Sequence, residues 1–144
     1  MFSKIMVPLD GSKQAEAALE YACDLAQNYS ASLHLIRVCW GPMQVLLEGE
    51  PVLNRPESLQ LEEESAQKYL QQLEEALRVQ GQVCQVETAT GDPAECIIDS
   101  VAEHAIDLIV ITSRGRTGLK RFLMGSVAER VARHAGCPVL IVGR

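Results

Sequence analysis

Short strand-like runs alternate with amphipathic helical segments along this whole 144-residue chain, and this alternation limits the fold more than any other feature. Four of the runs are almost continuously apolar, as strands buried on both faces are, and one alternates between apolar and polar residues. In chain order, the five expected strands cover residues 4–9, 32–39, 83–89, 107–112 and 138–142, of which 83–89 is the alternating one.

Between these runs, apolar residues recur at three- and four-residue spacing, which is typical of helices with one buried face. Gly81 is expected to end the second helix, and Asp92 to cap the third, with a proline in its first turn. Residues 41–57 are rich in glycine and proline, so we expect them to be irregular. The four helices are expected over residues 15–26, 59–77, 93–102 and 126–135.

Strict alternation of strands and helices favours a parallel sheet that helices cover on both faces. We therefore expect an α/β fold: a single open, doubly wound, Rossmann-like sheet of five parallel strands in the order 3-2-1-4-5, with four helices on its two faces. The length suits one domain spanning residues 1–144.

Composition excludes several classes of protein. A net charge of −6 argues against nucleic-acid binding, and no apolar stretch approaches the roughly 18 residues of a membrane helix. The beginning of the chain shows no signal-peptide pattern, and five scattered cysteines without a C-x-x-C pair indicate reduced thiols. We expect a cytoplasmic protein that binds neither nucleic acid nor membrane. Because no histidine has another histidine or a cysteine at ligand spacing, we expect no zinc site.

Ligands of doubly wound sheets bind beyond the carboxyl ends of the strands. The segment after the fourth strand, residues 112–126, contains four basic residues and no acidic one: Arg114, Arg116, Lys120 and Arg121. The rest of the chain has nine basic and 19 acidic residues, a net of −10. So concentrated a positive charge on an acidic protein indicates a site for a discrete anion.

The glycines of this segment allow backbone N–H groups to approach an anion closely, and Gly125-Ser126 opens a helix whose dipole favours phosphate. The alternative is an ordinary capping box from Ser126 to Glu129, which starts a helix without any ligand. Asp10, after the first strand, also has two interpretations: a turn residue at the start of a helix, or a contact to a ribose hydroxyl or a metal ion.

Three segments carry a resemblance to a known family: residues 5–12 (IMVPLDGS), residues 91–95 (GDPAE) and the closing run from 113 to 142. Over essentially its whole length, the chain is similar to single-domain members of the universal stress protein family. An ATP-binding branch of that family carries G-x-x-G, nine residues and then G-[ST]. Gly115 and Gly125-Ser126 match the later part, whereas the first glycine falls at Thr112. A threonine there costs roughly 1–3 kcal/mol if the position requires positive φ, and nothing if it is an ordinary strand end.

The resemblance implies a site for ATP or another adenine nucleotide at the carboxyl ends of strands 1 and 4, with Mg²⁺ at Asp10. Pro8 and Asp10 would line the adenine and ribose, and Val38 would offer a backbone contact to the base. The phosphate side would comprise Thr112, Arg114, Gly115, Arg116, Gly125, Ser126 and Val127.

The resemblance also implies a homodimer through the terminal strand, which opens at Pro138 and closes at Val142; the alternative is that a loop or helix of the same subunit covers this edge. Three functions follow: an ATP-binding stress-response or signalling regulator, a slow ATPase or phosphotransferase, and a dimeric interaction module that binds no nucleotide. No catalytic base is identifiable beside the phosphate segment, so we expect a protein that is not an enzyme, with at most weak ATP hydrolysis.

Overall fold

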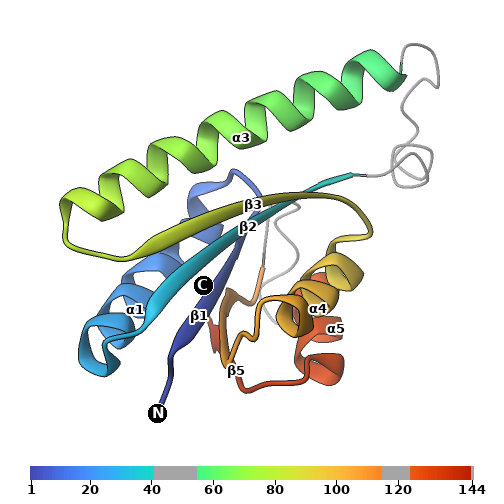
Figure 1. The fold of residues 1–144 in the computed structure, drawn as a ribbon. Helices are drawn as coiled ribbons and strands as arrows, with labels where there is room; N and C mark the ends of the chain where they lie inside the picture. The colour runs from blue at the N-terminus through green and yellow to red at the C-terminus, as the bar shows by residue number, and fades with distance from the viewer. Residues whose placement is uncertain (41–54, 115–123, 144) are drawn as a thin grey trace.

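The computed structural model describes residues 1–40, 55–114 and 124–143. In chain order (Figure 1), the elements are β1 (Lys4–Leu9), α1 (Lys13–Tyr29), β2 (Ser32–Trp40), α3 (Arg55–Val79), β3 (Cys84–Gly91), α4 (Pro93–Glu103), β4 (Leu108–Thr112), α5 (Ser126–His134) and β5 (Val139–Val142).

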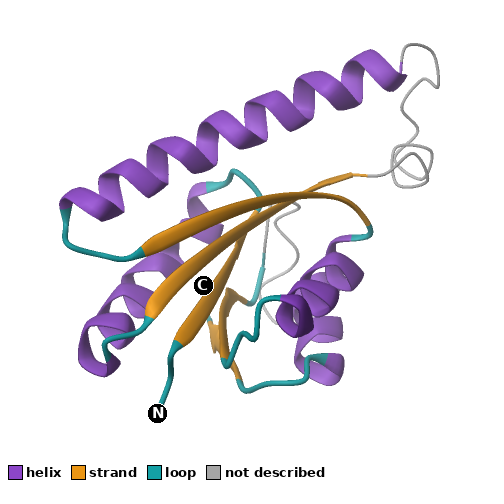
Figure 2. Cartoon of the chain, in the orientation of Figure 1, coloured by secondary structure: helices purple, strands orange, loops and turns teal. Residues whose placement is uncertain are grey.

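The five strands form one parallel sheet in the order β3-β2-β1-β4-β5, which confirms the expected fold class and strand order. Helices α1 and α3 pack on one face of the sheet, and α4 and α5 on the other (Figures 1 and 2). The change of face occurs between β1 and β4, which is the switch point of a doubly wound sheet.

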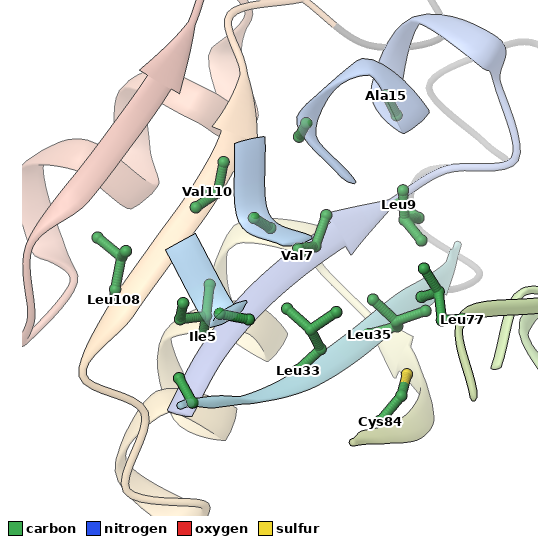
Figure 3. Packing of buried hydrophobic residues seen from close by; sticks show 14 of the residues in the cluster. Ile5, Val7, Leu9, Ala15, Leu33, Leu35, Leu77, Cys84, Leu108 and Val110 are labelled. Carbon is green, nitrogen blue, oxygen red and sulfur yellow. The ribbon is translucent and has the colours of Figure 1, made fainter. Parts of the chain in front are cut away.

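The apolar runs are continuous because each inner strand is buried on both faces. Ile5, Val7 and Leu9 of β1 point toward α1 and α3 together with Leu33 and Leu35 of β2 (Figure 3). The alternate residues pack beneath α4 and α5: Met6, Ile36, Ile109 and Ile111.

Local chemistry explains where the helices begin and end. The side chain of Ser12 accepts a hydrogen bond from the Ala15 N–H and caps α1, and Asp92 caps α4 in the same way, as expected. Gly81 has a φ of +89°, the left-handed conformation that glycine adopts without strain, and it follows the end of α3 as expected.

Several boundaries differ from the expectations by a few residues, and two of these differences have a clear cause. Helix α3 begins at Arg55, so the last three residues of the stretch expected to be irregular are helical; residues 41–54 lie outside the described part. Pro56 was interpreted as a sign of irregular chain, but proline is well tolerated in the first turn of a helix. Strand β3 runs two residues further than expected, to Gly91, because it stays paired with β2 up to Trp40. None of the described helices is long and apolar enough to cross a membrane.

Candidate functional site

The sheet register aligns the candidate residues at one edge. Leu9 of β1 pairs with Arg37 of β2, so Asp10 and Val38 follow side by side. Met6 pairs with Ile109 of β4, and the same register continued by three residues places Leu9 level with Thr112. The ends of β1, β2 and β4 therefore lie along the same carboxyl edge of the sheet, where doubly wound sheets bind their ligands.

Asp10 shapes the turn between β1 and α1. Its Oδ1 accepts hydrogen bonds from the Ser12 N–H at 2.9 Å and from the Ser12 hydroxyl at 2.6 Å. That hydroxyl oxygen in turn accepts the Ala15 N–H at 3.1 Å. Asp10 thus has the structural role of a helix-start residue, and its contact to a ribose or a metal ion stays a prediction. Pro8 is buried just before it, and Val38 is half-buried on the neighbouring strand.

Arg37 is a residue of this edge that the sequence prediction missed. Gly11 has a φ of +89°, and a Cβ placed on it would lie 3.1 Å from the Arg37 guanidinium. The guanidinium also lies over the ring of Tyr69, 5.1 Å from its centroid, and the Tyr69 hydroxyl donates to Glu16 at 2.9 Å. Arg37 therefore places a cation against the turn that carries Asp10. The signal in the sequence was a charged residue inside an otherwise apolar strand.

Thr112 is an ordinary strand end. It pairs with Val142 of β5, and among the described residues only Ser30 and Ala105 combine a side chain with positive φ. The Thr112 side chain is buried, and its hydroxyl donates to the Arg114 carbonyl at 2.9 Å. Threonine therefore adds no backbone strain here. Of the two alternatives for this position, the structure supports the ordinary strand end, at which threonine costs nothing.

Helix α5 begins differently from the expected capping box. Its N-cap is Gly125, which has no side chain to accept a hydrogen bond, and Ser126 is already the first helical residue. The first intrahelical bond runs from the Glu129 N–H to the Gly125 carbonyl at 3.0 Å. The interpretation of Ser126 as a cap is therefore wrong, and the N-cap residue, Gly125, makes no side-chain hydrogen bond to the amides of the first turn. Val127 lies half-buried in that turn.

The Gly125 amide is already engaged, because it donates to the Ser113 carbonyl at 2.6 Å. Gly125 is buried and has ordinary φ and ψ angles of −62° and 149°, which residues other than glycine also adopt. Arg114 is half-buried at the end of β4. Gly115 and Arg116 lie outside the described residues.

The chain matches the Universal stress protein family over residues 1–143. The chain belongs to this family. It is 32% identical to Universal stress protein YxiE of Bacillus subtilis, covering 99% of each chain. It is also 32% identical to Universal stress protein MJ0531 of Methanocaldococcus jannaschii, covering 99% of this chain and 82% of the relative. The structure of protein MJ0577 superposes with a TM-score of 0.83 at 28% identity, covering 100% of this chain and 97% of that one.

Two more distant structures of the family hold adenine nucleotides. A universal stress protein in complex with cAMP superposes with a TM-score of 0.73 at 21% identity, covering 98% of this chain and 97% of that one. An Arabidopsis thaliana member with AMP bound superposes with a TM-score of 0.68 at 20% identity, covering 99% and 92%. At identities of 20–21%, these two structures show that this chain shares their fold.

A second cluster lies away from this edge. His34 of β2, Glu87 of β3 and His104 at the end of α4 offer ligand atoms that all lie within 4.8 Å of one another. Spacing along the sequence gave no sign of this cluster, because the fold brings its residues together from three separate elements.

Proposed function

We propose that this chain binds ATP or another adenine nucleotide at the carboxyl ends of β1 and β4, and that it acts as a cytoplasmic stress-response or signalling regulator. Residues 1–144 act as one domain in this proposal. The adenine nucleotides held by two members of the family support the ligand class. The start of α5 carries the proposal for this chain itself.

Helix α5 begins at the carboxyl edge of the sheet, and its N-cap residue, Gly125, has no side chain that could cap the first-turn amides. Uncapped N–H groups and the positive end of the helix dipole form an anion site in many nucleotide-binding folds. Ser126 and Val127 would donate to the phosphates there, and Gly125 leaves room for them. Arg114 beside this turn adds positive charge, and the predicted roles of Gly115 and Arg116 complete the phosphate side.

On the other side of the site, Pro8 and Val38 would contact the base, and Asp10 the ribose. Asp10 would also hold Mg²⁺, since carboxylate oxygens and phosphates are its usual ligands. Thr112 keeps its side chain inside the fold and leaves the approach to the phosphates open.

The first experiment is calorimetric titration of the nucleotide-stripped protein with Mg-ATP, comparing Gly125→Val with Gly136→Val. Gly125 precedes α5 and Gly136 follows it, and a Cβ at Gly136 meets nothing within 4 Å. We expect micromolar binding that Gly125→Val abolishes and Gly136→Val preserves. If Gly125→Val melts like the wild type and still binds ATP, the phosphates do not bind at this turn.

Asp10→Asn tests the ribose and metal side. The amide oxygen still accepts the Ser12 N–H, so the turn persists while the charge is lost. We expect ATP affinity to fall by about tenfold or more and the dependence on Mg²⁺ to disappear. The control is Asp99→Asn, on the exposed side of α4. Equal affinities in the two variants would exclude Asp10 from the site.

A regulatory role requires that ATP bound at this site changes the free energy of the folded protein. At roughly millimolar ATP and a micromolar Kd, binding to the folded state alone stabilises it by about 4 kcal/mol. We expect the melting temperature to rise with ATP concentration. A folded protein that shows neither heat of binding nor a rise in melting temperature would favour the interaction module that binds no nucleotide.

We further propose a homodimer through β5, the edge strand after Pro138. Leu140 is 39% exposed there, and an uncovered apolar edge is a liability for a monomer. Leu140→Lys should convert the dimer to a monomer in analytical ultracentrifugation. Val83→Lys, at an apolar position that is 68% exposed and lies beside the opposite edge strand, should leave the dimer intact. A wild-type monomer at tens of micromolar would refute this assembly.

A further inference from the structure

The cluster of His34, Glu87 and His104 lies near the start of the sheet, at the opposite end from the proposed nucleotide site. His34 is the third residue of β2, whereas Val38 is near its end. His104 is the C-cap of α4, beside the start of β4. Each of the three side chains thus comes from a regular element that packing against the core holds in place.

The geometry centres on one carboxylate oxygen. Glu87 Oε2 lies 2.6 Å from His34 Nε2 and 3.6 Å from His104 Nε2. The two imidazole rings face each other with centroids 4.6 Å apart and planes inclined by 35°. Both Nε2 atoms therefore converge on the same side of one carboxylate.

These separations suit a small cation. Bonds of 2.0–2.2 Å to zinc in a tetrahedral arrangement put neighbouring ligand atoms roughly 3.3 Å apart. The His104–Glu87 separation is close to this value, and the His34–Glu87 separation has to widen by less than 1 Å. A metal ion would replace the proton that His34 Nε2 now shares with Glu87.

A fourth residue orients the carboxylate. The Ser100 hydroxyl of α4 is 1% exposed and donates to Glu87 Oε2 at 2.6 Å. Burial alone would raise the pKa of Glu87, but the hydrogen bonds from Ser100 and His34 and the two imidazoles outweigh it, so the pKa is lowered. The carboxylate is thus held in its ionised form, which is the form that binds metals, with a hydrogen-bonded outer partner.

Exposure indicates an open coordination position. The His34 side chain is only 6% exposed, whereas those of Glu87 and His104 are 22% and 36% exposed. One side of the cluster therefore faces solvent, where water completes the coordination. Two imidazoles and a carboxylate with an open position suit divalent ions such as Zn²⁺, Fe²⁺, Co²⁺ and Ni²⁺ rather than Mg²⁺ or Ca²⁺.

We propose that His34, Glu87 and His104 form a binding site for one divalent transition-metal ion, with Zn²⁺ as its representative, separate from the nucleotide site. The ligand atoms are the two Nε2 nitrogens and a Glu87 carboxylate oxygen. Ser100 is a positioning residue for that carboxylate. The site needs no nucleotide, so its failure and that of the proposed ATP function are distinguishable.

The test is calorimetric titration of the chelator-treated full chain with Zn²⁺, repeated with Co²⁺ in an optical cell. We expect one ion per chain, with visible Co²⁺ absorption typical of nitrogen and oxygen ligands. His104→Gln should weaken binding by more than tenfold. His134→Gln, at the only other histidine and exposed on α5, is the matched control and should bind like the wild type.

A second measurement needs no substitution at a buried position. In imidazole ¹⁵N–¹H spectra of the wild type, Zn²⁺ should shift His34 and His104 and leave His134 unchanged. The proposal is overturned by an absence of saturable binding, by equal affinities in His104→Gln and His134→Gln, or by thiolate-to-cobalt charge-transfer bands. The first result would mean that the cluster is a hydrogen-bond network only.

Discussion

Asp92 links the two helices on one face of the sheet, and its replacement should separate two contributions to stability. Its Oδ2 accepts the Glu95 N–H at 3.0 Å and so caps α4. Both carboxylate oxygens also face Nη1 of Arg130 on α5, at 2.9 and 3.1 Å. Losing an N-cap costs about 1 kcal/mol. The ion pair joins side chains that are 32% and 47% exposed, and such a pair contributes about 0.5 kcal/mol.

Asp92→Ala should therefore lower the free energy of unfolding by about 1.5 kcal/mol. In a chain of this length that corresponds to roughly 4–6 °C in melting temperature. Asp92→Asn keeps a capping oxygen and loses the charge, so it should cost only about 0.5 kcal/mol. Urea unfolding and calorimetry measure both variants.

Arg130 closes the cycle. Arg130→Ala should cost about 0.5 kcal/mol in the wild type and less in the Asp92→Asn background, where the carboxylate charge of residue 92 is lost and Glu95 at 3.9 Å remains as an ionic partner. If Asp92→Asn proves as costly as Asp92→Ala, the charge rather than the cap stabilises α4, and the assignment of the two contributions is refuted.

Three further predictions concern the core, a turn and the thiols. Leu70→Ala, at a fully buried position of α3, should destabilise the protein by about 2–5 kcal/mol in urea unfolding, whereas Leu61→Ala, at a 67% exposed position of the same helix, should change stability by less than about 0.5 kcal/mol. Gly11→Ala should lower the free energy of unfolding by about 1–2 kcal/mol in the same measurement, because alanine is strained at a φ of +89°. An unchanged free energy of unfolding would contradict this left-handed conformation at Gly11. Burial raises the pKa of both Cys39 and Cys84 to about 11, so roughly one in a thousand of each is thiolate at pH 8. Alkylation followed by peptide mapping should find both unmodified in the folded protein and modified in guanidinium, with reactivity rising as the pH approaches 11; rapid labelling at pH 8 would show that the two thiols are not held in the core.

The fold was predictable because its signals are local. Continuous apolar strands, the Asp92 cap and Gly81 after α3 each follow from a few neighbouring residues. The errors also have local causes. Pro56 was taken as a sign of irregular chain, although proline fits the first helical turn. At α5, Ser126 and Glu129 match a capping-box pattern, yet the N-cap lies one residue earlier, at Gly125, and Ser126 is already helical.

The candidate site was predictable in part, since its residues follow strands whose order the alternation implied. The strand register places Asp10, Val38 and Thr112 along the carboxyl edge of the sheet, and their roles in a site stay predictions. Arg37 was missed because its place beside the Asp10 turn depends on the orientation of its side chain, which brings the guanidinium close to Gly11. A strand pattern predicts which face of the sheet a residue occupies. It does not predict that the side chain of Arg37 extends to Gly11 on the loop after β1.

The cluster of His34, Glu87 and His104 shows why spacing along a sequence is a poor guide to side-chain clusters in a parallel sheet. His34 and Glu87 are 53 residues apart, yet the β2–β3 register pairs Ile36 with Glu87, so the two side chains are diagonal neighbours on the face beneath α4. Ser100 and His104 are four residues apart and therefore share one face of the end of that helix. Once a parallel order is inferred, candidate ligands should be sought across the register of adjacent strands and along the helix that follows them. The same search applied to the alternating strand, residues 83–89, would have paired Glu87 with the only histidine of β2.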